Sequence, residues 1–383
     1  MLIMGFKHGP QLGWVFFRYW SSWERIRCAV AFFPTESFRL SLRCMSNLVR
    51  VAVIGTGSLG KEHARIYADL AKAGLAEFTG VFDANPEAAR THAARWGVRA
   101  FASVAEAAEV SDALSVVTPT VTHHAIAREL LSLGRHVLVE KPMTDNSDQA
   151  QDLVRLAQEK GLVLQVGHVE RFNPVFSYLE QAAPFPKFIE CHRLSPFPAR
   201  STDIGVVLDL MIHDLDVVMA FVKSPVVSVD AVGIPVLSRS EDIANARLRF
   251  ANGCVANLTA SRISPERMRK IRVFSGGDHP VYISLDYRVQ EGFLYRLARD
   301  GEEESSLLRK LLSAKESTIV SEFAGKRIVR EPVPINKDEP LKLELSDFVA
   351  CVRERQAPKV SGAQAKAALD VAFEIVRQIQ ASP

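Results

Sequence analysis

The residues best suited to proton chemistry lie on one otherwise apolar segment. Residues 206–221 (VVLDLMIHDLDVVMAF) predict a helix whose polar members are Asp209, His213, Asp214 and Asp216. Positions i, i+4 and i+7 of a helix share a face, so Asp209, His213 and Asp216 form one stripe. Ionisable groups on a buried helix cost free energy unless they are paired or used, and histidine titrates near neutral pH. The stripe favours a functional role for His213 and Asp209, although Asp214 and Asp216 are equally explained as structural or solvated.

A second candidate group follows a short apolar strand predicted over 136–139. The chain continues as Glu140-Lys141-Pro142, and a proline restricts the backbone of the residue before it. A lysine held at the end of a buried strand is poorly explained as a solvated charge. Lys141 is therefore interpreted as a functional cation, with an ion pair to Glu140 as the alternative.

A glycine-rich turn joins the first apolar strand (49–54) to a helical pattern over 61–73. The residues expected at a cofactor pyrophosphate are Gly55, Gly57, Ser58, Leu59 and Gly60. Glycines in this spacing let the backbone approach a pyrophosphate, while the helix N-terminus presents N–H groups and a positive dipole end. Asp83 ends the next strand, predicted over 78–82, and is placed to accept hydrogen bonds from ribose hydroxyls. A carboxylate there repels a 2′-phosphate, so we predict NAD rather than NADP.

Strands alternate with helices over the first half of the chain, which indicates βαβ units and a doubly wound parallel sheet. Beyond Asp83 we predict helices over 86–96, 122–133 and 147–160, and strands over 113–117, 136–139 and 162–166. Ligands bind at the carboxyl edge of such sheets. The residues predicted at that edge are Thr118, Pro119, His123, Glu140, Lys141 and His168.

The composition excludes several classes of protein. The 383 residues are 48% hydrophobic and 24% charged with a net charge of +3, so broad electrostatic capture of nucleic acid is not expected. The 5 cysteines are scattered and form no C-x-x-C pair, which indicates a reducing compartment and no structural zinc. No apolar run reaches the roughly 18 residues that a membrane-spanning helix needs. We therefore expect a cytoplasmic protein without a metal, a nucleic-acid partner or a membrane partner.

Residues 1–48 differ in composition from the rest of the chain. They are rich in basic residues and contain Trp14, Trp20 and Trp23, three of the 4 tryptophans. A secretory signal needs a continuous apolar core and a cleavage site, and a transit peptide does not usually carry so many large aromatics. We predict that translation begins at Met45 and that 1–48 is a non-native or poorly ordered extension, with a targeting segment as the alternative.

Taken together, the motifs resemble the Gfo/Idh/MocA family of nicotinamide-dependent sugar oxidoreductases. The motifs that carry the resemblance are Gly55-x-Gly57-x-x-Gly60, Asp83, Pro119, Glu140-Lys141-Pro142, Gly167-His168 and Asp209-x-x-x-His213-x-x-Asp216. The resemblance implies an α/β fold with a Rossmann NAD-binding domain over 49–168. An α+β substrate and oligomerisation domain over 169–383 would follow, with an open, mainly antiparallel sheet. Its last helix, about 363–380, would return to the first domain.

The sequence agrees with such a second domain, because six apolar runs, each bounded by turn-forming residues, predict strands there. The strands predicted there span 188–194, 226–233, 245–250, 255–261, 269–274 and 281–284.

By resemblance, the reaction is hydride transfer from a carbinol carbon to NAD. Lys141 would donate to the substrate oxygen and His213 is favoured as the general base, while Asp209 would orient the substrate hydroxyls or the imidazole. Family members differ over whether lysine or histidine takes the proton, and that choice stays open. A homo-oligomer, either dimer or tetramer, is also implied.

The stretch GHVERFNP over 167–174 is similar to the nucleotide-sugar branch of the family. That branch oxidises the 3-hydroxyl of UDP-N-acetylglucosamine on the route to lipid A precursors. The similarity implies substrate contacts from His168, Arg171 and Asn173, although Arg171 is equally explained as a cap of the domain junction. The alternatives are a cyclitol or free-sugar dehydrogenase and, in another class, a non-catalytic nucleotide-binding regulator.

Three further polar residues lie on the way to the stripe helix, namely His192, Arg193 and Arg200. They are candidates to contact a diphosphate. Ordinary surface charge is the slightly favoured explanation for all three.

Overall fold

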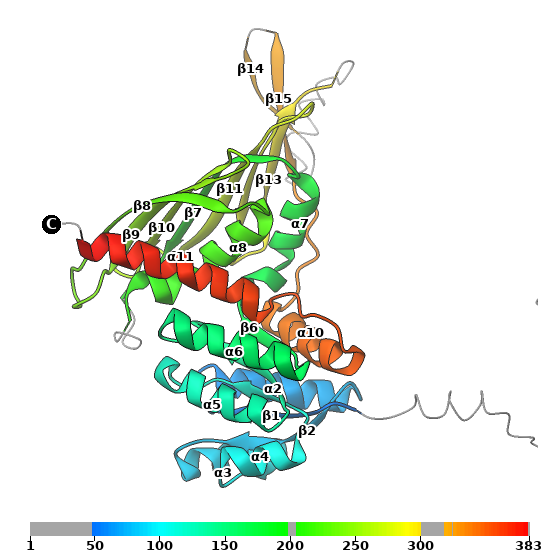
Figure 1. The fold of residues 1–383 in the computed structure, drawn as a ribbon. Helices are drawn as coiled ribbons and strands as arrows, with labels where there is room; N and C mark the ends of the chain where they lie inside the picture. Colours follow the sequence, from blue (N-terminus) through cyan, green and yellow to red (C-terminus); the bar gives the residue numbers. More distant parts are fainter. Residues whose placement is uncertain (1–47, 198–203, 300–317, 324, 382–383) are drawn as a thin grey trace, which may run out of the picture. The chain divides into compact units, whose positions relative to one another are not determined.

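The computed structural model describes residues 48–197, 204–299, 318–323 and 325–381. The predicted extension therefore lies outside the described residues except for residue 48, and Arg200 lies outside them as well. The described chain from Leu48 onward contains two sheets with helices packed on them (Figure 1).

The first sheet, here called the Rossmann sheet, has six parallel strands within the described residues, in the order β3-β2-β1-β4-β5-β6. Its strands are β1 (Arg50–Ile54), β2 (Glu77–Phe82), β3 (Arg99–Ala100), β4 (Ala113–Val116), β5 (His136–Glu140) and β6 (Leu164–Gly167). Apart from the exposed two-residue β3, their apolar runs are buried on both faces, as in other parallel sheets. The strand order reverses between β1 and β4, and ligands bind at such a switch point.

Helices cover both faces of the Rossmann sheet. The helices of this half are α2 (Gly60–Lys72), α3 (Pro86–Trp96), α4 (Val104–Val110), α5 (Thr120–Ser132) and α6 (Ser147–Lys160). One face packs against α4, α5 and α6, and the other against α2 and α3. The predicted bounds of α3 and α6 are confirmed, because Asn85 and Asn146 cap their N-termini and Gly97 and Gly161 adopt left-handed φ at their C-termini.

The second sheet has nine strands within the described residues, in the order β14-β15-β13-β12-β11-β7-β10-β9-β8. Its strands are β7 (Pro186–Leu194), β8 (Val226–Ile234), β9 (Ile243–Phe250), β10 (Val255–Ser261), β11 (Met268–Ser275), β12 (Val281–Asp286), β13 (Glu291–Leu297), β14 (Thr318–Phe323) and β15 (Lys326–Pro332). Neighbouring strands are antiparallel except for the parallel pair β7 and β10. The predicted fold class, a parallel α/β half followed by a mainly antiparallel half, is confirmed.

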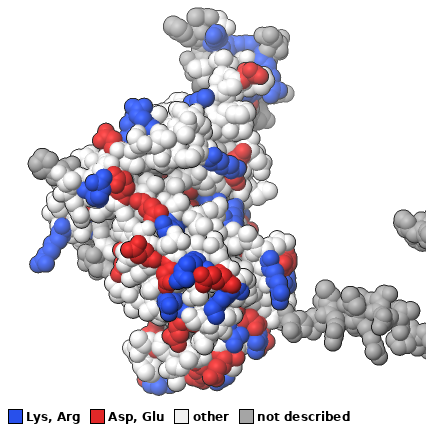
Figure 2. Space-filling model, in the orientation of Figure 1, with Lys and Arg blue, Asp and Glu red and all other residues white. Residues whose placement is uncertain are grey.

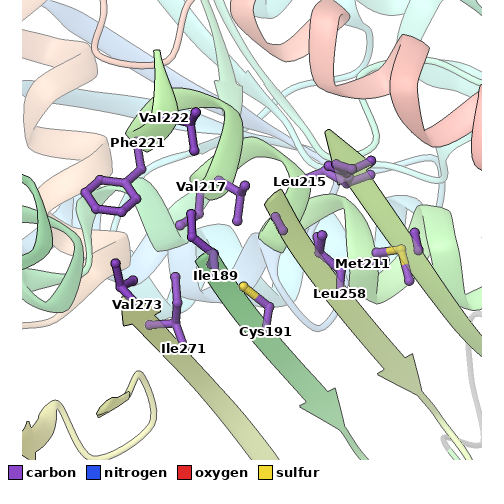
Figure 3. Close-up of a cluster of buried hydrophobic side chains, with 14 of the residues drawn as sticks. Ile189, Cys191, Met211, Leu215, Val217, Phe221, Val222, Leu258, Ile271 and Val273 are labelled. Atoms are coloured by element: carbon purple, nitrogen blue, oxygen red, sulfur yellow. The ribbon is translucent and has the colours of Figure 1, made fainter. Parts of the chain in front are cut away.

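One face of the second sheet, here called its inner face, carries the core of this half. The elements that cover it are α7 (Pro174–Ala182), the π-helical turn η2 (Val207–Met211), α8 (Ile212–Val222) and α11 (Gly362–Ala381). The 3₁₀ turn η1 (Val169–Phe172) precedes α7 and places Phe172 in the Rossmann core. Figure 3 shows Ile189 of β7 and Ile271 and Val273 of β11 on the side of the sheet that faces Val217 and Phe221 of α8, with Cys191 on the same side. Because side chains alternate along a strand, the residues between these four lie on the opposite, outer face.

The last two helices connect the halves of the described chain. Helix α10 (Pro340–Glu354) packs on the Rossmann sheet through Leu345 and Phe348. Helix α11 places Ala365 and Leu369 in the Rossmann core, while Ala372 and Ile375 join the core of the second sheet.

The surface shown in Figure 2 carries acidic and basic side chains intermingled, with no region of one sign. Among the residues that the structure describes, no helix combines the length and the apolar character needed to cross a bilayer.

Candidate active site

The glycine-rich turn between β1 and α2 leaves space where a dinucleotide needs it. Gly55 has a φ of +95°, a conformation that favours glycine. A Cβ on Gly60 would collide with the carbonyl oxygen of Gly55, whereas a Cβ on Gly57 would meet no described atom within 4 Å beyond its chain neighbours. Ser58 and Leu59 are exposed at the start of α2. The turn therefore fits a pyrophosphate at the helix N-terminus.

Asp83 lies beside this turn and is oriented by it. Its Oδ2 accepts hydrogen bonds from the backbone N–H and the hydroxyl of Thr56, both at 2.7 Å, and its Oδ1 accepts one from the N–H of Asn85 at 2.9 Å. Partial burial alone would raise the pKa of Asp83, but these bonds outweigh it and hold the pKa below its ordinary value. The carboxylate is ionised, and Oδ1 keeps a lone pair for a ribose hydroxyl.

His123 lies beneath the carboxyl edge of the sheet. Its Nδ1 is 2.9 Å from the carbonyl oxygen of Pro142 and its Nε2 is 2.8 Å from that of Thr118. Burial lowers the pKa of His123. Thr118 is partly buried and Pro119 is exposed at the start of α5. The imidazole thus links the segments that follow β4 and β5, so any influence it has on a cofactor acts through those segments.

Glu140 and Lys141 point to different partners at the end of β5. The buried carboxylate of Glu140 lies 3.1 Å from Nε2 of His63 and accepts the backbone N–H of Lys141 at 3.2 Å. A Cβ on Gly167 would lie 2.6 Å from this carboxyl group, so the glycine makes room for it. The ammonium of Lys141 donates to Asp209, whereas Glu140 accepts only the backbone N–H of Lys141.

The predicted helix over 206–221 has two parts, because η2 is π-helical and α8 begins at Ile212. The uniform helical period assumed for the stripe is therefore wrong over its first turn. Single π-helical turns occur frequently at functional sites. Here Asp209 accepts from Nζ of Lys141 through its backbone oxygen at 2.8 Å and through Oδ1 at 3.2 Å. Both side chains are mostly buried, which strengthens the ion pair.

His213 follows Asp209 by one turn. Burial is the main cause that lowers the pKa of His213 well below its ordinary value. The positive charges of Lys141 and Arg193 add to this effect on the pKa, and His168 and Arg269 act in the same direction. The imidazole is therefore neutral at neutral pH and able to accept a proton.

His168 stands edge-on to His213, with ring centroids 6.3 Å apart. Burial lowers the pKa of His168 and raises the pKa of Asp216, and both side chains are almost fully enclosed. Asp216 lies 3.5 Å from Nη1 of Arg171. His168 was one of three residues expected to contact the substrate, and the structure places it next to His213.

Arg171 and Asn173 make internal contacts. Arg171 donates to the carbonyl oxygen of Lys359 at 3.3 Å and lies over the ring of Phe176 at 4.9 Å, which favours its interpretation as a cap of the junction. Asn173 caps α7 by accepting the N–H of Val175 at 3.1 Å, and its amide donates to Glu170 at 3.1 Å. These contacts position the segment after β6.

Both expectations for Arg193 are wrong, since it is neither a surface charge nor open to a ligand. It is 3% exposed and donates to Asp214 at 2.9 and 2.8 Å and to Glu170 at 3.0 Å. Asp214 is buried by the same pairing, so it is structural.

His192, one residue earlier on β7, lies on the outer face of the sheet, away from α8. Arg269 on β11 was not singled out by the sequence, because no local pattern marks it.

Sequence models of known domains match both halves of the chain. The model described as an oxidoreductase family with an NAD-binding Rossmann fold matches residues 49–168, and the GFO/IDH/MocA C-terminal domain matches residues 186–276.

Individual relatives match this chain over different lengths. The UDP-N-acetylglucosamine 3-dehydrogenase of Acidithiobacillus ferrooxidans is 35% identical over 334 residues, which are 87% of this chain and 98% of that protein. A solved structure of that dehydrogenase has a TM-score of 0.75 at 34% identity and covers 88% of this chain and 99% of that one. The inositol 2-dehydrogenase of Rhizobium meliloti is 26% identical over 231 residues, 56% of this chain and 69% of that protein.

The fold, the glycine turn and the buried lysine–aspartate–histidine group together define an oxidoreductase that uses a nicotinamide cofactor. With matches over both halves and 35% identity to a full-length relative, the chain belongs to the Gfo/Idh/MocA family. The resemblance predicted from the motifs is confirmed.

Proposed function

We propose that this chain is an NAD-dependent dehydrogenase that oxidises the 3-hydroxyl of UDP-N-acetylglucosamine to a ketone. The chemistry is proposed from one observation. The ammonium of Lys141 is held by Asp209, and Asp209 lies one turn before His213, whose imidazole is neutral. The sugar is proposed from the 35% identical relative that bears this activity in its name.

The proposed cofactor site is the glycine turn together with Asp83. When bound there, the nicotinamide supplies the acceptor for a hydride from the carbinol carbon. Gly57 leaves the backbone open to the pyrophosphate, and the ionised Asp83 accepts a ribose hydroxyl. The same carboxylate repels a 2′-phosphate, which favours NAD.

Substitution of Asp83 tests the proposed preference for NAD over NADP. Asp83→Ala should raise the Kd for NAD about 10- to 100-fold, because a hydrogen bond to a charged group is lost. The Kd for NADP should fall or stay unchanged. Titration of cofactor fluorescence measures both constants, and an equal rise in both would exclude the ribose role.

Lys141 is proposed to stabilise the substrate oxygen. An ammonium has three donors, and the backbone and carboxylate oxygens of Asp209 take two of them. The third N–H is available to the substrate oxygen, where it stabilises the negative charge that develops as the hydroxyl proton leaves. A mostly buried ion pair also restrains the side chain of Lys141 in one place.

His213 is proposed as the general base. The substrate hydroxyl is a very weak acid, so its proton must be taken as the hydride departs. The neutral imidazole accepts it, while the ammonium of Lys141 is already a proton donor. The buried neighbour His168 packs edge-on against the ring and restrains it.

A homo-oligomer is proposed from the outer face of the second sheet. Phe188, Phe274, Tyr282 and Tyr295 form a row of neighbouring rings across it, and Phe274 is 40% exposed. Exposed apolar surface of this kind marks interaction sites. Light scattering after gel filtration should give a dimer or tetramer mass, and a monomer mass would reject the proposal.

Absorbance at 340 nm tests the reaction and the substrate together. The purified protein would be given NAD or NADP with UDP-N-acetylglucosamine, myo-inositol or glucose, and a keto-trapping amine would prevent product from limiting the reaction. NADH formed with the UDP-sugar alone is the expected result. NADH formed with inositol or glucose instead would keep the chemistry and replace the substrate. No NADH in protein that binds NAD would favour a regulator.

A further inference from the structure

We propose that Arg269 binds the diphosphate of the nucleotide-sugar and so distinguishes that substrate from an uncharged sugar. The inference rests on the proposed function, since among the sugar substrates considered only a nucleotide-sugar carries a diphosphate. Arg269 is the second residue of β11.

Strand pairing places Arg269 on the side of the catalytic helix. Arg269 lies directly opposite Arg193 in the antiparallel pair of β11 and β7, and directly opposed residues point to the same face. Arg193 reaches Asp214 on α8, so this face is the inner one. Arg269 is therefore a cation on the face that carries His213, and its charge helps to lower the pKa of His213.

The nearby acidic groups are satisfied without Arg269. Asp214 receives two hydrogen bonds from Arg193, and Glu170 receives one from Arg193 and one from Asn173. Arg269 approaches Glu170 only to 3.7 Å, which is longer than a hydrogen bond. Among the described residues, this 3.7 Å approach to Glu170 is the ion pair that Arg269 makes, so its guanidinium keeps donors for a ligand.

Exposure and charge make Arg269 suitable for an anion. The side chain of Arg269 is 51% exposed, whereas that of Arg193 is 3% exposed. Burial is the main cause that lowers the pKa of Arg269; Arg193 and Arg288 act in the same direction, while Glu170 and Asp214 oppose them. The planar guanidinium matches phosphate oxygens with two parallel donors.

The shape of the substrate agrees with this placement. The 3-hydroxyl and the diphosphate of a nucleotide-sugar are attached at different positions of the sugar ring. A ring with its hydroxyl at His213 therefore extends its diphosphate to a neighbouring element. Strand β11 is such an element, because it pairs with β7, whose Arg193 binds Asp214 on α8.

Isothermal titration with UDP and with uridine tests the inference without turnover. The native protein saturated with NAD would be compared with Arg269→Gln and with Arg272→Gln. Arg272 is the matched control, because it lies three residues later on the same strand but on the outer face. Melting temperature and NAD affinity report whether each variant is folded.

Arg269→Gln should raise the Kd for UDP about 10- to 100-fold, the loss expected for a charge-assisted hydrogen bond. The Kd for uridine should stay unchanged, and Arg272→Gln should bind UDP like the native protein. Arg269→Lys should recover part of the loss, since it keeps the charge without the fork. Native affinity for UDP in Arg269→Gln, or no binding of UDP to the native protein, would overturn the inference.

The outcome separates this inference from the proposed function. If the protein oxidises UDP-N-acetylglucosamine and Arg269→Gln has the native KM, the function stands and the inference fails. If UDP binding depends on Arg269 but that sugar is not oxidised, the diphosphate site stands and the sugar is a different one.

Discussion

The nucleotide turn and the catalytic group are built in opposite ways. The turn occupies six consecutive residues, 55–60, and its shape depends on backbone conformation and on the absence of side chains. The catalytic group joins Lys141 after β5 to Asp209 and His213 on η2 and α8, more than sixty residues away. The turn depends on the space that its glycines leave open. The catalytic group depends on burial and charge, because they keep His213 neutral and restrain Lys141.

This difference predicts how each region responds to substitution. Changes in the catalytic group should remove rate while leaving the cofactor bound, since we propose that its residues act on the substrate. Changes in the turn should remove cofactor affinity while leaving the proton chemistry intact. The following substitutions test that division, beginning with the largest expected effect.

Lys141→Met should lower kcat about 10³-fold, because a preorganised donor to the substrate oxygen is lost. The Kd for NAD should stay within about twofold of native, since the glycine turn and Asp83 are untouched. Steady-state kinetics and cofactor titration measure the two quantities. Native kcat in this variant would remove Lys141 from the mechanism.

Arg193→Met should lower the free energy of unfolding by about 3–5 kcal/mol, because Asp214 and Glu170 would be left as buried charges without their partner. Arg65→Met is the control in the Rossmann half. Arg65 is partly exposed and pairs with Glu62 and Glu339, so its loss should cost at most about 1 kcal/mol. Urea unfolding measures both, and equal losses would contradict the importance of burial.

His213→Asn should lower kcat about 10²-fold and change the pH profile. Because the pKa of His213 is held well below its usual value, native kcat/KM should be flat through neutral pH and fall only as pH drops through that lowered pKa. The acid limb should disappear in the variant. An acid limb that persists there would assign the base to another group.

Gly57→Ala and Gly60→Ala separate the two uses of glycine in the turn. Gly57→Ala should weaken NAD about tenfold with an unchanged melting temperature, because its Cβ meets only the space reserved for the cofactor. Gly60→Ala should lower the melting temperature as well, because its Cβ collides with the carbonyl oxygen of Gly55. Identical behaviour of the two variants would reject this division.

The sequence predicted the Rossmann half closely because its signals are local. Helices over 86–96 and 147–160 have capping asparagines and C-terminal glycines, and the structure has the same bounds. β3 was missed because it is only two residues long, and α4 because seven residues give little periodic signal. The strands β13 to β15 were also missed, although short connections join β12 to β13 and β14 to β15.

For the catalytic group, the sequence predicted which residues take part but not their full geometry. Lys141, Asp209 and His213 were singled out by type and spacing, and the structure brings Lys141 and Asp209 into contact. The π-helical turn was not predictable, because an apolar run looks the same for both helix types. The burial of Arg193 and the exposure of Arg269 depend on which strands pair, and no local pattern reports that.

A single-turnover experiment tests the central claim most directly. Enzyme saturated with NAD and in excess over UDP-N-acetylglucosamine would be mixed in a stopped-flow instrument, and absorbance at 340 nm would be followed. The account predicts a rapid rise in the native protein and no rise on the same timescale in Lys141→Met, although both bind NAD. An equal rise in both, or none in the native protein, would contradict it.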